Sequence, residues 1–150
     1  MFSTEKMVSM RGKVATAEVD VDAAPGRVWQ ALTDTAEVKE WMAGTTLKTD
    51  WQVGSLITWS GEYDGNSYQD KGEVVAYDEP RELSVTHFSP LTGQEDVPEN
   101  YHTLVYTLKE ESGRTQLRLS QDNCADEDEA EKFSKNWQQM LDGIKAHIES

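Results

Sequence analysis

The run DEDEAEKFSKNWQQMLDGIKAHIES, Asp126 to Ser150, decides the fold of this chain. Its apolar residues recur at three- and four-residue spacing, so they form one stripe of a predicted α-helix. The stripe consists of Phe133, Trp137, Met140, Leu141, Ile144 and Ile148. Polar residues that can stay in water occupy the opposite side: Lys132, Lys135, Gln138, Asp142, Lys145 and Glu149. Because most of the preceding chain has the pattern of strands, a single long helix is available to cover a sheet.

Seven segments before this helix have strand patterns bounded by turn residues. They span residues 13–21, 45–51, 55–63, 68–78, 82–88, 101–110 and 115–121. Asp64-Gly65 and Ser112-Gly113 are typical of tight hairpins, which predicts a mostly antiparallel sheet. Between the first two strands, Pro25 can begin one short helix, and the pair Asp34 and Glu37 resembles a capping box that begins a second. The predicted order is strand, two short helices, six strands and the long helix.

Length and composition predict one domain. A chain of 150 residues can bury a substantial core, and we expect residues 1–12 to be a flexible N-terminal segment and 13–150 to be a single domain. The one cysteine, Cys124, cannot form an internal disulfide, which fits a reducing cytosol. The sequence contains no signal-peptide core and no apolar run long enough for membrane insertion, so a cytoplasmic protein is expected. A net charge of -14 argues against a nucleic-acid partner.

Motifs for conventional catalysis and for cofactor binding are absent from the sequence. It contains no GxSxG elbow, phosphate-binding glycine loop or dinucleotide fingerprint, and its three histidines lack metal-ligand spacing. We therefore predict no catalytic residue, no cofactor and no metal. The acidic residues Asp122 and 126–129 are interpreted as carboxylates that favour a helix N-terminus, rather than as a calcium site. The long connection 89–100 fits either a functional rim or a simple surface excursion.

Strand alternation predicts which side chains face inward. The predicted inward set consists of Leu83, Val85, His87, Leu104, Tyr106, Leu108, Leu117, Leu119 and Gln121. Together with Trp41, Trp59, Tyr63 and the helix stripe, it offers aromatic walls with a few polar tips, as a small-molecule pocket requires. The alternative is that these residues pack against one another as core. His87 is a candidate for acid–base or binding work, whereas His102 and His147 are expected at a strand end and on the outer side of the helix.

Four segments in this order resemble the SRPBCC or START-like superfamily. They are APGRVWQALTDTAEVKEW (24–41), GEVVAYDEPRELSVTHF (72–88), YTLKEESGRTQLRLSQDN (106–123) and NWQQMLDGIKAHIES (136–150). The resemblance covers about 14–149, and is strongest to bacterial homologues of the activator of the heat-shock-protein ATPase. It implies an α+β helix-grip fold, also called START-like or birch-pollen-allergen-like. In that fold a curved antiparallel sheet of about seven strands wraps around the long C-terminal helix, and two short helices close one end. The resemblance also implies a cavity between sheet and helix.

These observations favour a cytoplasmic protein that binds a small, largely hydrophobic molecule of lipid-, polyketide- or aromatic-like type. The predicted ligand-binding residues are Trp41, Trp59, Tyr63, His87, Tyr106, Gln121, Trp137 and Leu141. A cyclase- or hydrolase-like enzyme, in which His87 works with Tyr63 or Glu62, stays open as an alternative. So does a co-chaperone-like domain that stimulates an ATPase, although a chaperone partner is the least favoured reading. A homodimer is compatible with the sequence.

Overall fold

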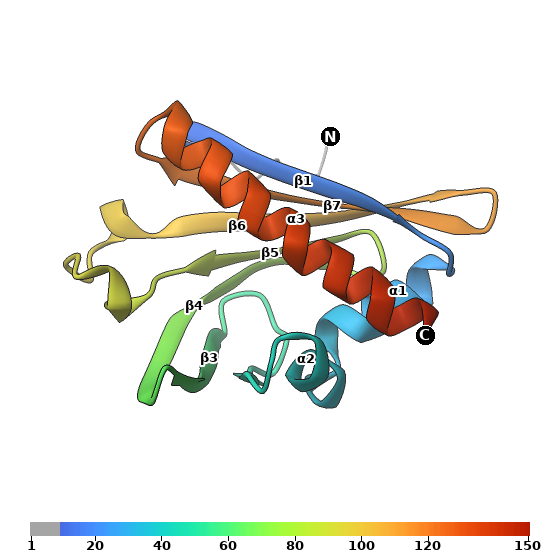
Figure 1. The fold of residues 1–150 in the computed structure, drawn as a ribbon, viewed down its shortest axis with the longest axis horizontal. Helices are drawn as coiled ribbons and strands as arrows, with labels where there is room; N and C mark the ends of the chain where they lie inside the picture. Colours follow the sequence, from blue (N-terminus) through green and yellow to red (C-terminus); the bar gives the residue numbers. More distant parts are fainter. Residues whose placement is uncertain (1–9) are drawn as a thin grey trace.

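The helix predicted at the C-terminal end is present as α3 (Glu127–Glu149), and it crosses one face of an antiparallel sheet diagonally (Figure 1). The computed structural model describes residues 10–150, apart from the Tyr63 side chain. Two short helices, α1 (Pro25–Thr33) and α2 (Thr35–Trp41), follow the first strand. The predicted α+β helix-grip architecture is therefore confirmed.

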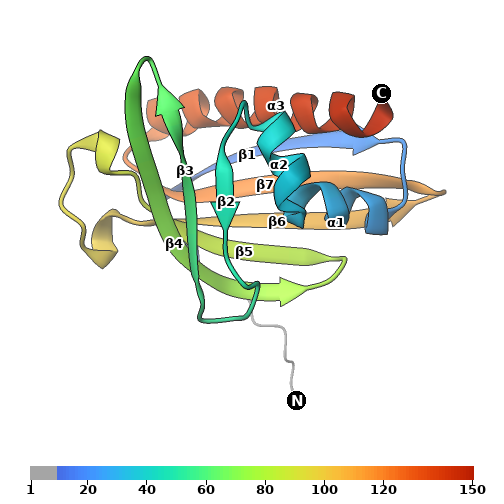
Figure 2. The ribbon, with the colours of Figure 1, turned by 90° about the horizontal axis from the view of Figure 1, so that it is seen from below.

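The sheet has seven strands in the order β1-β7-β6-β5-β4-β3-β2. Their bounds are β1 Lys13–Val21, β2 Thr46–Lys48, β3 Leu56–Tyr63, β4 Asn66–Asp78, β5 Glu82–His87, β6 His102–Glu111 and β7 Arg114–Cys124. The long β4 pairs with β3 along its first part and with β5 along its last part. Figure 2 shows the β3–β4 hairpin turning up toward the side of the sheet that carries α3. The sheet is therefore curved, and β1 is one of its two edges.

Both predicted hairpin dipeptides form two-residue turns. Tyr63 pairs with Asn66 across Asp64 and Gly65, whose φ angles are 54° and 80°. The β6–β7 turn at Ser112-Gly113 has φ angles of 53° and 82°. Positive φ at both central residues is the type I′ geometry, whose twist matches that of the flanking strands.

Helix α2 begins at a capping residue and is tied to α3. The Asp34 side chain accepts hydrogen bonds from the backbone N–H groups of Ala36 at 2.9 Å and of Glu37 at 3.2 Å, as the capping-box pattern predicts. The Glu37 carboxylate instead lies 2.9 Å from Arg27 Nη1 and 2.8 Å from His147 Nε2. The expectation that His147 lies on the outer side of the helix is wrong, because its ring fills the contact between α3 and α2.

Helix α3 is fastened along the free edge of β1 by its own polar side chains. The bonds are Thr16 N to Ser134 Oγ (3.1 Å), Glu18 N to Gln138 Oε1 (3.4 Å), Gln138 Nε2 to Glu18 O (3.0 Å), Lys145 Nζ to Asp20 O (2.7 Å) and Asp22 N to Glu149 Oε2 (2.7 Å). An edge strand presents a row of unpaired backbone groups, and here the helix satisfies them. Gln138, Lys145 and Glu149 therefore bind the sheet edge while they stay in contact with solvent.

The apolar stripe of α3 is divided between two surroundings. Leu141 and Ile144 are fully buried in the core beneath the helix, whereas Trp137 and Met140 are only partly buried. Burial of one large apolar side chain contributes roughly 1.5–3 kcal/mol. Leu141 and Ile144 therefore anchor the helix to the core. Trp137 and Met140 are less completely covered by the sheet.

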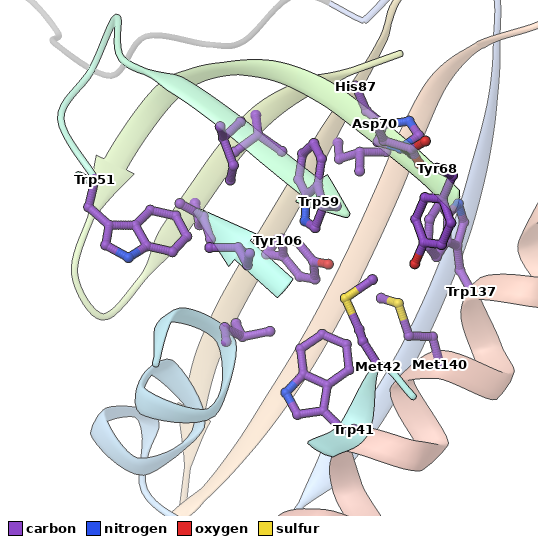
Figure 3. A pocket seen from close by; sticks show the side chains of 16 residues that line it. Trp41, Met42, Trp51, Trp59, Tyr68, Asp70, His87, Tyr106, Trp137 and Met140 are labelled. Atoms are coloured by element: carbon purple, nitrogen blue, oxygen red, sulfur yellow. Dashed lines mark hydrogen bonds and ion pairs between the residues drawn. The ribbon is translucent and has the colours of Figure 1, made fainter. Parts of the chain in front are cut away.

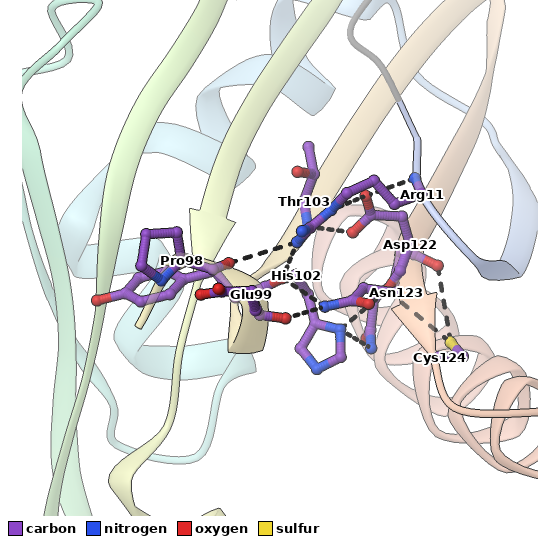
Figure 4. A network of polar contacts seen from close by, with 10 residues as sticks. Arg11, Pro98, Glu99, His102, Thr103, Asp122, Asn123 and Cys124 are labelled. Carbon is purple, nitrogen blue, oxygen red and sulfur yellow. Dashed lines mark hydrogen bonds and ion pairs between the residues drawn. The ribbon is translucent and has the colours of Figure 1, made fainter. Parts of the chain in front are cut away.

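The acidic residues before α3 divide into a helix cap and a buried carboxylate. Asp126 accepts from Glu129 N at 2.8 Å, and Glu129 Oε1 accepts from Ala125 N at 2.7 Å, so carboxylates cap the start of the helix as predicted. The interpretation is wrong for Asp122, whose side chain is fully buried. It accepts from the backbone N–H groups of Thr103 at 2.6 Å and Arg11 at 2.9 Å (Figure 4).

Asp122 therefore joins β7 to β6 and to the chain that precedes β1. Most of the segment expected to be flexible, 1–12, lies outside the described residues. Arg11 lies inside them, and its guanidinium donates to the Tyr101 carbonyl at 2.8 Å. Arg11 also accepts, through its carbonyl, a hydrogen bond from Asn123 N at 2.6 Å.

Two alanine substitutions separate these two kinds of carboxylate. We expect Asp122→Ala to lower the free energy of unfolding by about 3–5 kcal/mol, because it leaves buried N–H donors without an acceptor. Asp126→Ala removes only an exposed helix cap and should cost about 1 kcal/mol. Urea unfolding followed by tryptophan fluorescence measures both. Equal losses in the two variants would contradict the structural role given to Asp122.

Candidate functional site

A cavity of about 200 Å³ lies between the curved part of the sheet and α3 (Figure 3). Its lining comes from both short helices, from β2 to β6 with the loop before β3, and from α3. The lining residues are Leu32, Trp41, Met42, Leu47, Trp51, Ile57, Trp59, Tyr68, Asp70, Leu83, Val85, His87, Leu104, Tyr106, Trp137 and Met140. Among the described residues, none from β1 or β7 takes part. The cavity therefore lies on the side of α3 that faces away from the edge strand β1.

Five of the eight residues predicted for the site lie around this cavity. Trp41, Trp59, His87, Tyr106 and Trp137 all contribute to its lining. They come from four strands or helices and from the end of α2, so the fold brings together residues that are far apart in the sequence. Whether they bind a ligand stays a prediction.

Two further predicted residues lie behind the lining. Leu141 is fully buried in the core. Gln121 is also buried, and its Oε1 accepts a hydrogen bond from Trp137 Nε1 at 2.7 Å, while its Nε2 lies 3.1 Å from His102 Nδ1. Gln121 therefore fixes the Trp137 ring instead of contacting the cavity. Tyr63, the eighth residue, ends β3, and its side chain lies outside the described part of the structure.

The sequence analysis missed several lining residues. Trp51 is expected to end the strand 45–51, but the strand there is only β2 (Thr46–Lys48), and Trp51 lies in the loop that follows it. Tyr68 and Asp70 lie on β4 two residues apart, so alternation places them on one face. Because the neighbouring residues are also polar, the sequence does not show that this face points inward. The long connection 89–100, which had been a candidate rim, contributes no residue to the lining.

Hydrogen bonds within the cavity wall hold three of the indole rings. Trp41 Nε1 donates to the Ala31 carbonyl at 2.8 Å, and Trp51 Nε1 donates to the Thr33 carbonyl at 3.2 Å. Trp137 is held in the same way by Gln121. Because the polar atom of each ring is already paired with the protein, these indoles offer the cavity mainly their apolar faces.

A histidine–aspartate pair lies in the cavity lining. His87 Nε2 lies 2.9 Å from Asp70 Oδ2, and the His87 ring packs edge-on against Trp59 with centroids 5.1 Å apart. The partner of His87 is therefore Asp70. Glu62, one of the two partners considered for His87 in the enzyme alternative, is exposed on β3.

Tyr106 places a hydroxyl group in the middle of the cavity (Figure 3). Burial raises the pKa of this hydroxyl well above its ordinary value of 10.0, because a phenolate is disfavoured in apolar surroundings. At neutral pH the group is therefore a neutral hydrogen-bond donor and acceptor.

Within the described residues, no group of three or more His, Cys, Asp or Glu side chains is arranged to hold a metal ion. None of the helices that the structure describes is long and apolar enough to cross a membrane. Cys124 is buried, and burial raises the pKa of its thiol.

Comparison with known proteins places this geometry in context. The model of the family described as "Activator of Hsp90 ATPase homolog 1-like protein" matches residues 22–149. The solution structure of ChR145 from Cytophaga hutchinsonii is 39% identical, with a TM-score of 0.82, over 95% of this chain and 97% of that one. No curated protein matches the chain.

Two more distant structures share the fold. The Aha1 dimer from Colwellia psychrerythraea is 18% identical, with a TM-score of 0.70, over 91% of this chain and 96% of that one. An HSP90 activator from Plasmodium falciparum is also 18% identical, with a TM-score of 0.68, over 90% of this chain and 95% of that one. At this level of identity, the likeness shows the common architecture.

The raised pKa of Tyr106 predicts how stability depends on alkaline pH. Above pH 10, the unfolded chain releases the phenol proton while the folded protein keeps it, so the free energy of unfolding falls as pH rises. One such proton contributes at most about 1.4 kcal/mol per pH unit. Tyr106→Phe should therefore show a shallower decline than the wild type in urea unfolding measured at successive pH values. Identical slopes would contradict the burial of this hydroxyl.

Proposed function

The chain belongs to the family of activator of Hsp90 ATPase homolog 1-like proteins, and on that premise we propose that it binds a small, largely hydrophobic molecule in the cavity between the sheet and α3. The observation that carries this proposal is the set of four indoles around one unfilled space: Trp41, Trp51, Trp59 and Trp137. Aromatic walls with few polar groups are typical of small-molecule sites.

The volume of the cavity limits the size of the ligand. An apolar cavity of about 150 Å³, engineered in another protein, holds benzene, and typical ligand pockets begin at roughly 300 Å³. At about 200 Å³, this cavity suits one ring with a short substituent. A long lipid chain does not fit within this volume.

Two other functions rank below ligand binding. The pair of His87 and Asp70 is suited to proton transfer, but the described lining adds no Ser, Cys or Lys that could serve as a nucleophile. Activation of a chaperone ATPase is suggested by the family description and by the name of one distant neighbour. A cavity is not needed for that role, so it leaves the main feature of this structure unexplained.

Two matched substitutions test whether the space accepts a ligand. Leu83 lines the cavity, whereas Leu117 is fully buried away from it. Leu83→Phe should fill the cavity, change the free energy of unfolding by less than about 1 kcal/mol, and weaken binding of ethylbenzene or indole at least tenfold. Leu117→Phe should lower the free energy of unfolding by about 1–3 kcal/mol through overpacking and should keep the wild-type affinity for both probes.

Isothermal titration calorimetry and urea unfolding provide the two measurements. If the wild type binds neither probe, ligand binding in this cavity is refuted. The same conclusion follows if Leu83→Phe is destabilised as strongly as Leu117→Phe, because the space would then already be packed.

A further inference from the structure

One carboxylate oxygen in the cavity wall has no hydrogen-bond partner among the described residues. Asp70 Oδ2 is paired with His87, but Asp70 Oδ1 is buried and unpartnered. A buried acceptor left in this state destabilises the fold, and more so when it is charged. Such atoms are rare in native structures, and each needs an explanation. A ligand that donates a hydrogen bond to Asp70 would supply the missing partner.

No permanent cation in the lining balances the charge of Asp70. It is the only carboxylate among the residues that line the cavity, and the lining contains neither lysine nor arginine. The adjacent Lys71 belongs to the other face of the strand, as alternation requires, and its ammonium group pairs with Asp96 in the 89–100 connection. The ligand site is therefore apolar except for one negative charge, the His87 ring, hydroxyl groups and the indole N–H of Trp59.

The surroundings of Asp70 favour a cationic donor over a neutral one. Hydrogen bonds to charged partners are roughly twice as strong as neutral ones. The faces of Trp and Tyr rings attract ammonium groups, and Trp59 lies in this wall beside the His87 ring. The net charge of -14 also draws cations toward the protein. A carboxylate ligand, such as a fatty acid, would face repulsion from Asp70 without an opposing cation.

We propose, building on the ligand-binding function above, that the cavity takes a small amine. Its protonated nitrogen donates to Asp70 Oδ1, and its hydrocarbon body lies among the indole rings. The final torsion of an aspartate side chain is broad, so a modest rotation of the carboxylate presents the free oxygen to the ligand. His87 keeps its bond to the other oxygen and fixes the position of the carboxylate.

A series of probes with the same one-ring body tests this proposal. The probes are ethylbenzene, 2-phenylethanol, 2-phenylethylamine and 3-phenylpropionate. Titration calorimetry at about pH 8 keeps a primary alkylamine protonated. The wild type should bind the amine at least tenfold more tightly than the alcohol, and the propionate most weakly.

Asp70→Asn and Glu73→Gln form a matched pair of variants. Both remove one negative charge from β4, but Glu73 is exposed and does not line the cavity. Asp70→Asn should reduce the preference for the amine over the alcohol to threefold or less, and should leave the affinity for ethylbenzene unchanged. Glu73→Gln should keep the full preference.

The outcomes separate this proposal from the function on which it rests. If the wild type binds ethylbenzene, alcohol and amine equally, the amine proposal is overturned and hydrophobic binding stands. If none of the four probes binds, the cavity function itself fails. If Asp70→Asn weakens binding of all probes to the same extent while Glu73→Gln does not, Asp70 only maintains the wall, and the proposal is also overturned.

Discussion

The attachment of α3 to the free edge of β1 is the interaction on which the rest of this structure depends. Side chains from Ser134 to Glu149 satisfy backbone groups of the edge strand, so the helix is held at one side of the sheet. Near the opposite edge of the sheet, the β3–β4 hairpin bends up toward the face that carries α3 (Figure 2). Because the helix cannot lie against both edges at once, Leu141 and Ile144 fill the core, while Trp137 and Met140 border a cavity.

The polar atoms around this cavity are distributed unequally, and that distribution gives the site its chemical character. The indole N–H groups of Trp41, Trp51 and Trp137 are bonded to the protein itself. Their rings therefore contribute apolar area without requiring polar partners from a ligand. What remains for recognition is the Asp70 carboxylate beside His87, the Tyr106 hydroxyl group and the indole N–H of Trp59. A site of this kind selects a ligand by one polar group attached to a small hydrocarbon body.

The order of helices and strands and their antiparallel pairing were predictable from local patterns, because helix periodicity, strand alternation and turn dipeptides report on backbone geometry directly. The curved helix-grip arrangement was implied by the family resemblance instead. Local patterns also identified some aromatic lining residues on regular strands, such as Trp59 and Tyr106, but not Tyr68. Contacts between distant segments were not predictable in this way. Asp70 reads as a surface residue until the curvature of β4 is known, and the burial of Asp122 depends on where Arg11 returns to the sheet.

The central claim is that α3 leaves an unfilled, accessible space beside Trp137, and the methionine methyl groups report on it most directly. The chain has five methionines, and Met42 and Met140 lie in the lining, whereas Met10 does not. In ¹³C-methyl NMR spectra of the ethylbenzene titration, we expect the signals of Met42 and Met140 to shift together and saturably while that of Met10 stays fixed. Unchanged signals from Met42 and Met140 at saturating ethylbenzene would contradict it.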